Sequence, residues 1–184
     1  MFTLFSFLLT APAMAQELVN ADTEDELMFT VALGAEFGGN TFSSCTGSLI
    51  TPQVILTAAH CGGDFPIELV ISAGKAFFGS NVETAESVGL SDGIIHPDYV
   101  ELTSGINGTL GQNDVGILVL AEPVDWVEPV WIATEPLDEI AEGATVTSIG
   151  FGVSNSNGAG SGIKRSAELV VDSIDDVFLI SNSA

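Results

Sequence analysis

The chain has 184 residues, of which 46% are hydrophobic, 25 are acidic and 3 are basic, so that its formal net charge is −22. This length and composition are typical of a globular chain with one large or two small cores, and they exclude a disordered polymer. A field this negative repels phosphate backbones and anionic lipids, so we expect neither nucleic acid nor a membrane surface as a partner.

The first residues predict an export signal. Residues 2–9 form a largely apolar run, and Ala13-Met14-Ala15 is a small-x-small site that a signal peptidase can cut before Gln16. No lysine or arginine precedes the run, and the run is shorter than the about 20 residues of a membrane span. A short buried helix or strand is the alternative. We expect a signal peptide at 1–15, a secreted or periplasmic protein, and no membrane anchor after cleavage.

Alternating side chains then predict β-strands. Residues 29–33 have the period of a half-buried strand, and residues 38–40 (GGN) predict a hairpin turn. Further short strands are expected at residues 41–50, 54–56, 68–72, 76–78, 88–90 and 94–95. No segment has a convincing helical period. The pattern is that of an all-β protein, a sandwich or a barrel.

The two cysteines, Cys45 and Cys61, lie on either side of a strand that leads to His60. An even number of cysteines in an exported chain predicts one disulfide, with two free buried thiols as the alternative. Such a bridge closes a loop for which the chain-entropy model gives about 3 kcal/mol. A histidine beside a half-cystine, at the end of a buried strand, is held firmly enough to transfer a proton.

Asp114 opens the apolar run 115–120, after a stretch at 101–112 whose glycine, serine, threonine and asparagine content predicts a surface loop. A carboxylate at this place is costly to bury unless it is hydrogen-bonded. The imidazole of His60 would satisfy it. A cap or turn acid at the start of a strand is the alternative.

Residues 122–136 are expected to connect two halves of the molecule, with 130–132 as an apolar anchor and Trp126 and Trp131 as packing residues. Strands are expected at 143–149, 167–171 and 178–180, with a loop at 154–162. Lys164-Arg165 is either a processing site or, more simply, a charged strand edge.

Five segments, in this order, resemble landmarks of the trypsin and chymotrypsin-like serine proteases: residues 45–50 (CTGSLI), 57–61 (TAAHC), 95–99 (IHPDY), 113–118 (NDVGIL) and 150–152 (GFG). The likeness runs from about residue 18 to about residue 171. It implies two six-stranded Greek-key β-barrels. We expect the first barrel at 18–121, the connection at 122–136 and a partial second barrel at 137–184.

The resemblance also implies functional residues. It makes His60 a general base, Asp114 the residue that orients it, and polypeptides the substrates, with no cofactor. Residues 16–17 become a short pro-segment and Leu18 a new amino terminus, although Leu-Val-Asn-Ala stands where active members have Ile-Val-Gly-Gly and a plain linker is equally compatible. His96 is expected in a structural turn.

The family often has a calcium loop in the region of residues 75–87. Glu83 and Glu86 are the candidate ligands there. Two acids in so acidic a chain are more often surface residues, and calcium requires six or more oxygens. We therefore expect no metal site.

The Gly-Asp-Ser-Gly-Gly segment that carries the nucleophile and the oxyanion hole in the family is absent from the sequence. Ser181 and Ser183 are the last serines, and neither has neighbouring glycines. We therefore expect a carboxy-terminally truncated serine endopeptidase that is inactive as it stands. A secreted, non-catalytic binding module on the same scaffold is the alternative.

Overall fold

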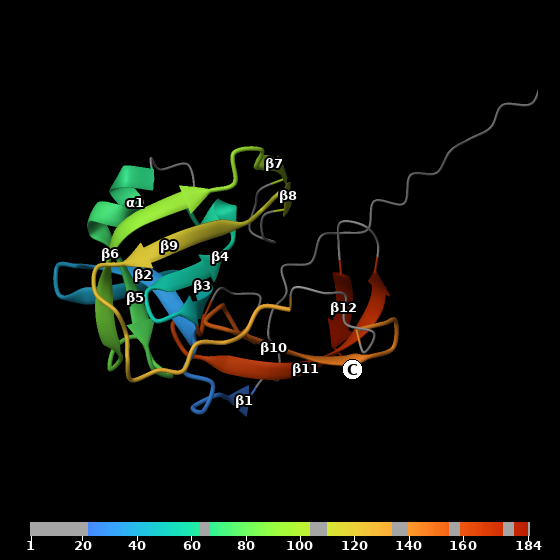
Figure 1. The fold of residues 1–184 in the computed structure, drawn as a ribbon. Helices are drawn as coiled ribbons and strands as arrows, with labels where there is room; N and C mark the ends of the chain where they lie inside the picture. Colours follow the sequence, from blue (N-terminus) through green and yellow to red (C-terminus); the bar gives the residue numbers. More distant parts are fainter. Residues whose placement is uncertain are drawn as a thin grey trace, which may run out of the picture.

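The computed structural model describes residues 22–62, 67–103, 110–133, 140–154, 159–174 and 179–183. Figure 1 shows a barrel at one end of the molecule and a second sheet at the other. No helix in the described ranges combines the length and apolar character needed to cross a membrane. The predicted signal peptide, the pro-segment and Leu18 lie outside these ranges.

Six antiparallel strands close the barrel in the order β2-β3-β4-β9-β6-β5. Their bounds are β2 Thr30–Phe37, β3 Asn40–Thr51, β4 Val54–Thr57, β5 Gly74–Phe78, β6 Glu86–Ile95 and β9 Gly116–Leu120. Its interior holds fully buried side chains, among them Val31, Leu49, Ile55 and Leu120. Each contributes about 1.5–3 kcal/mol of burial free energy. Closure leaves the barrel without an unpaired edge.

The second sheet contains β1 (Asp22–Thr23), β10 (Thr145–Gly150), β11 (Arg165–Ile174) and β12 (Leu179–Ser183). Strand β11 pairs with the other three, each time antiparallel. Leu169 and Val171 are the buried apolar residues of β11. The predicted all-β fold is confirmed, with one closed barrel and a second sheet that is open over the described residues.

Hydrogen bonds donated by three backbone N–H groups attach the second sheet and its loops to the barrel. The Phe151 N–H donates to Thr46 Oγ1 over 3.0 Å, so the end of β10 is joined to β3. The Val82 N–H donates to the Gly162 carbonyl over 3.0 Å, and the Lys164 N–H to the Ser80 carbonyl over 2.8 Å. The barrel therefore supports the start of β11 directly.

The strand expected at 68–72 is wrong, because this segment is part of helix α1 (Ile67–Ala73). A short run of apolar residues fits both periods, and the neighbouring structure decides between them. Here Ile67 packs against the barrel core, and α1 lies against β6. The tertiary contact, not the β-branched composition, sets the helical conformation.

Among the turns and connections, the predicted hairpin turn is confirmed, but the predictions for residues 101–112 and for Trp131 are wrong. Gly38 and Gly39 both have positive φ, as the two-residue hairpin turn requires. The stretch expected to be all loop contains strands β7 (Val100–Thr103) and β8 (Leu110–Gln112), which pair with each other. Trp131 was expected to pack, but it is 93% exposed. Val124 and Val127 fill the core in its place.

Candidate active site

The pairing of β4 with β9 brings His60 and Asp114 together. Thr57, the last residue of β4, is the register partner of Gly116, the first residue of β9. Because the strands are antiparallel, the residues that follow Thr57 lie opposite those that precede Gly116. His60 lies three residues beyond Thr57, in the 3₁₀-helix η1 (Ala59–Gly62), and Asp114 two residues before Gly116. Residues 54 positions apart in sequence thus become neighbours.

The Asp114 carboxylate binds His60 at two points. Oδ2 lies 2.7 Å from the ring Nδ1, and Oδ1 accepts a hydrogen bond from the His60 backbone N–H over 2.8 Å. An ionised carboxylate can only accept, so Nδ1 carries the proton in this bond and Nε2 of the neutral ring has the free lone pair. The side chains of His60 and Asp114 are 33% and 19% exposed. The ring is thus fixed at one nitrogen and accessible to a reactant.

Hydrogen bonds outside the pair hold Asp114 in place. Asn113 adopts a left-handed conformation (φ 53°), which asparagine tolerates better than most residues. Its side-chain amide donates to the Asp98 carbonyl over 2.9 Å, and the His96 N–H donates to the Val115 carbonyl over 3.0 Å. The turn of residues 96–99 therefore supports the backbone on both sides of the carboxylate. His96 begins this turn, in agreement with the structural turn predicted for it from the sequence.

A disulfide fixes the histidine side of the pair. Cys45 of β3 and Cys61 of η1 are joined by an S–S bond of 2.02 Å, as expected from the two cysteines. The Thr57 hydroxyl donates to the Thr46 carbonyl over 2.9 Å, which links the end of β4 to β3. Both ends of the short connection from β4 to η1 are thereby attached to β3.

The described residues offer little to a metal ion. One group of possible ligand atoms, from Cys45, His60 and Cys61, lies within 4.8 Å, but the two sulfurs are bonded to each other and are not thiolates. Glu83 lies in the turn after β5, and Glu86 begins β6. In the described ranges no third ligand residue gathers with them.

The last serines of the sequence, Ser181 and Ser183, lie on β12, in register with Val171 and Leu169.

Lys164 was misread from the sequence. Its side chain is fully buried, its Nζ donates to the Leu27 carbonyl over 2.9 Å, and Nζ lies 5.7 Å from the centroid of the Phe151 ring. Burial lowers the pKa of the ammonium group, and the nearby Glu24 and Asp25 carboxylates oppose that shift. A protease cannot reach this side chain, and it is not an exposed edge. Strand alternation gives no signal for it, because Lys164 precedes β11.

Comparisons with known proteins agree with this geometry. The sequence model of a family described as Trypsin matches residues 21–174. The chain is 30% identical over 148 residues to a protein named trypsin from Saccharopolyspora erythraea. This alignment covers 80% of this chain and 60% of that protein. It is 32% identical over 113 residues to kallikrein 1-related peptidase b24 of Mus musculus, covering 59% and 42%. Brachyurin of Leptuca pugilator is 29% identical over 118 residues, covering 63% and 48%. The chain thus spans roughly half the length of these relatives.

Proposed function

Since the chain belongs to the trypsin family of serine proteases, we propose that His60 and Asp114 are the general base and its orienting acid in a serine endopeptidase. The observation that carries the proposal is the two-point bond between the Asp114 carboxylate and His60, at the ring and at the backbone. The bond to Nδ1 favours the tautomer with the proton on that nitrogen, and the bond from the backbone N–H holds the carboxylate in position beside the ring.

In the proposed reaction, Nε2 of His60 accepts the proton of a serine hydroxyl as the hydroxyl oxygen attacks the scissile carbonyl carbon. The imidazolium that forms is stabilised by Asp114, which stays ionised. Nε2 then returns the proton to the leaving amine. Proton transfer by a positioned side chain contributes about 10²–10⁴ in rate. The rest of the acceleration requires the nucleophile and an oxyanion hole.

Neither of these two parts can be assigned within the 184 residues, since the sequence lacks Gly-Asp-Ser-Gly-Gly. We therefore propose that the chain by itself is inactive, with a base and an orienting acid but no hydroxyl to activate. For the same reason a non-catalytic binding module on the protease scaffold stays the second candidate. The substrates of the complete enzyme are proposed to be polypeptides, in keeping with the peptidases named among the relatives.

The proposed place of action is outside the cytoplasm. A disulfide joins Cys45 to Cys61, and such bonds persist in oxidising compartments. The apolar run of residues 2–9 with its small-x-small site supports the same proposal.

Nitrogen NMR of the histidine ring tests the base in the chain as it exists. In the uncharged form of the ring we expect His60 to carry its proton on Nδ1, and Asp114→Asn to mix or reverse the two tautomers. His96 is the internal control and should not change. A His60 ring protonated at Nε2 in the unmodified protein would contradict the proposed role.

Fluorophosphonate labelling tests the missing nucleophile. The 184-residue chain should not react, because acyl transfer needs the serine and the oxyanion hole together. Stoichiometric labelling that disappears in His60→Ala would show that a serine of this chain is the nucleophile. That result would overturn the proposed inactivity and would also exclude the non-catalytic alternative.

A further inference from the structure

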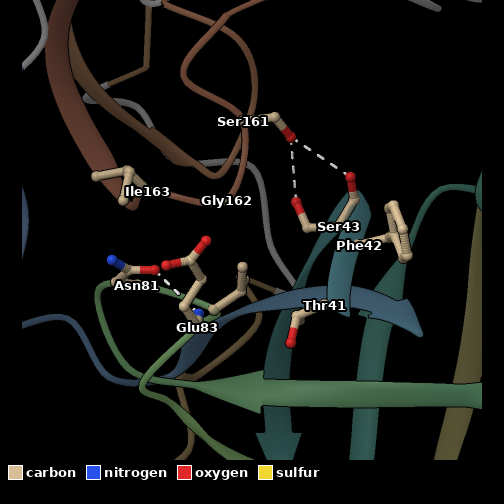
Figure 2. Close-up of a pocket in the computed structure, with 9 residues that line it drawn as sticks. Thr41, Phe42, Ser43, Asn81, Glu83, Ser161, Gly162 and Ile163 are labelled. Atoms are coloured by element: carbon tan, nitrogen blue, oxygen red, sulfur yellow. Dashed lines mark hydrogen bonds between the residues drawn. The ribbon is translucent and has the colours of Figure 1, made fainter. Parts of the chain in front are cut away.

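A pocket that the proposed reaction does not use lies where the barrel meets the loop before β11. Its volume is about 320 Å³, close to the lower limit of about 300 Å³ for small-ligand sites. Three segments line it (Figure 2): the start of β3, the turn after β5, and the loop that leads to β11. The lining residues are Thr41, Phe42, Ser43, Asn81, Val82, Glu83, Ser161, Gly162 and Ile163.

The walls of the pocket are fixed before any ligand arrives. Asn81 and Ile163 form an isolated antiparallel bridge, next to the bond from the Val82 N–H to the Gly162 carbonyl. The Ser43 and Ser161 hydroxyls lie 3.2 Å apart, and Ser161 also donates to the Ser43 carbonyl over 3.4 Å. A preformed site loses less conformational entropy when it binds.

The loop can approach this closely because residue 162 is glycine. Its φ is +86°, and a Cβ built there would lie 2.8 Å from Cγ2 of Val82. Any larger residue would push the loop away from the turn and open the wall. The shape of the pocket is therefore sensitive to the residue at position 162.

Glu83 supplies the charge of the pocket, being the one ionisable residue among the described residues that line it. Its backbone N–H donates to Asn81 Oδ1 over 2.9 Å, which fixes the turn, and Figure 2 shows its carboxylate directed toward Gly162. The hydroxyls of Ser43 and Ser161 provide further acceptors. A carboxylate and neighbouring hydroxyl acceptors together complement a cationic side chain that can donate several hydrogen bonds.

We propose that this pocket binds a basic side chain of a polypeptide, with arginine preferred to lysine. A planar guanidinium can bond a carboxylate and neighbouring hydroxyls at the same time, whereas an ammonium is a single point charge. The net charge of −22 favours the approach of basic ligands. That the ligand is a polypeptide rests on the proposed protease function.

The pocket lies close enough to the proposed base for one extended polypeptide to contact both. Ser43 is two residues from Cys45 along β3, a distance of about 7 Å. Cys45 is bonded to Cys61, the residue directly after His60. The pocket would therefore select a basic residue a few positions away from the bond that the enzyme cleaves.

Amide NMR of the ¹⁵N-labelled 184-residue chain tests the binding without any catalysis. The probes are three acetylated, amidated tetrapeptides, Ala-Xaa-Leu-Ala, in which Xaa is arginine, lysine or norleucine. The arginine peptide should shift the amide signals of Glu83, Ser161 and Gly162, and the norleucine peptide should not. Glu83→Gln should weaken arginine binding about tenfold, which corresponds to about 1.4 kcal/mol.

Glu86→Gln is the matched control, because Glu86 is also exposed and lies three residues away but does not line the pocket. It should leave the affinity unchanged. Equal binding of the arginine and norleucine peptides, or an equal loss in both glutamate variants, would overturn the proposal.

The His60 tautomer and the binding of the arginine peptide are separate measurements, and this distinguishes the present inference from the proposed function. If the His60 tautomer contradicts the proposed base, the pocket can still bind arginine. If the arginine peptide does not bind while His60 has the expected tautomer, only the pocket proposal is wrong.

Discussion

The barrel and the second sheet differ in how each is closed, and this difference shows where the functional geometry is decided. The barrel strands pair in a complete circle around fully buried residues such as Leu49 and Leu120. The second sheet is open over its described residues and is attached to the barrel through Thr46 and Ser80. His60 and Asp114 both adjoin barrel strands, so the pairing of these strands brings them together. The pocket lined by Glu83 and Gly162, in contrast, depends on the attachment between the two parts.

The largest expected effect is a loss of stability when one buried leucine from each part is replaced by alanine. Leu49→Ala in the barrel should cost toward the upper end of the about 2–5 kcal/mol measured for such changes, because a closed core cannot collapse around the cavity. Leu169→Ala in β11 should cost toward the lower end, since an open sheet can relax. Urea unfolding of the two variants measures the difference. Equal losses, or a larger loss for Leu169→Ala, would contradict the comparison.

The disulfide tests whether the barrel needs an additional constraint near His60. Replacing both Cys45 and Cys61 by alanine should lower the free energy of unfolding by about 3 kcal/mol, through a less constrained unfolded chain. The urea midpoint measures the loss, and the reduced unmodified protein should show a similar one. The His60 signals should broaden while those of β11 stay sharp. Broadening of β11 alone would show that the bridge mainly supports the second sheet.

Thr46→Val tests the attachment between the two parts. It keeps the shape of the side chain but removes the acceptor of the Phe151 N–H, at a cost of about 1–3 kcal/mol for an unsatisfied buried donor. Hydrogen exchange should accelerate in β10 and β11 and stay slow in β4 and β9. Thr46→Ser retains the hydroxyl and is the control. Uniform acceleration across the barrel would mean that the two parts unfold as one unit.

Replacing Lys164 should have the smallest effect on stability, and this effect should depend on pH. Burial depresses the pKa of this lysine in the folded state, so the unfolded chain binds more protons between that depressed value and the usual 10.5. The stability of the unmodified protein relative to Lys164→Met should therefore rise as the pH increases through this window. Urea unfolding of both proteins between about pH 8 and 10.5 measures the change. A relative stability that falls over this range would reverse the sign of the burial effect.

Much of the strand arrangement could be predicted from local pattern. The alternation at residues 29–33 and the Gly38-Gly39 turn give β2, β3 and the hairpin between them, because period and turn conformation are properties of a few adjacent residues. The half-burial predicted for this strand is wrong, because residues 30–33 are all buried, with Val31 and Ala32 in two different core clusters. The helical run at 67–73 could not be assigned this way. Its apolar residues suit either period, and only contact with β6 and the core made it a helix.

The sequence by itself determined the types of residue that can act, namely a histidine beside a half-cystine, a single acid before an apolar strand, and a small set of basic residues in a very acidic chain. The tertiary structure decided how they meet. The register of β4 with β9 sets the 2.7 Å contact between His60 and Asp114. The junction of three distant segments places Glu83 in a pocket and buries Lys164. Both outcomes depend on contacts between residues far apart in the chain, which neither periodicity nor composition encodes locally.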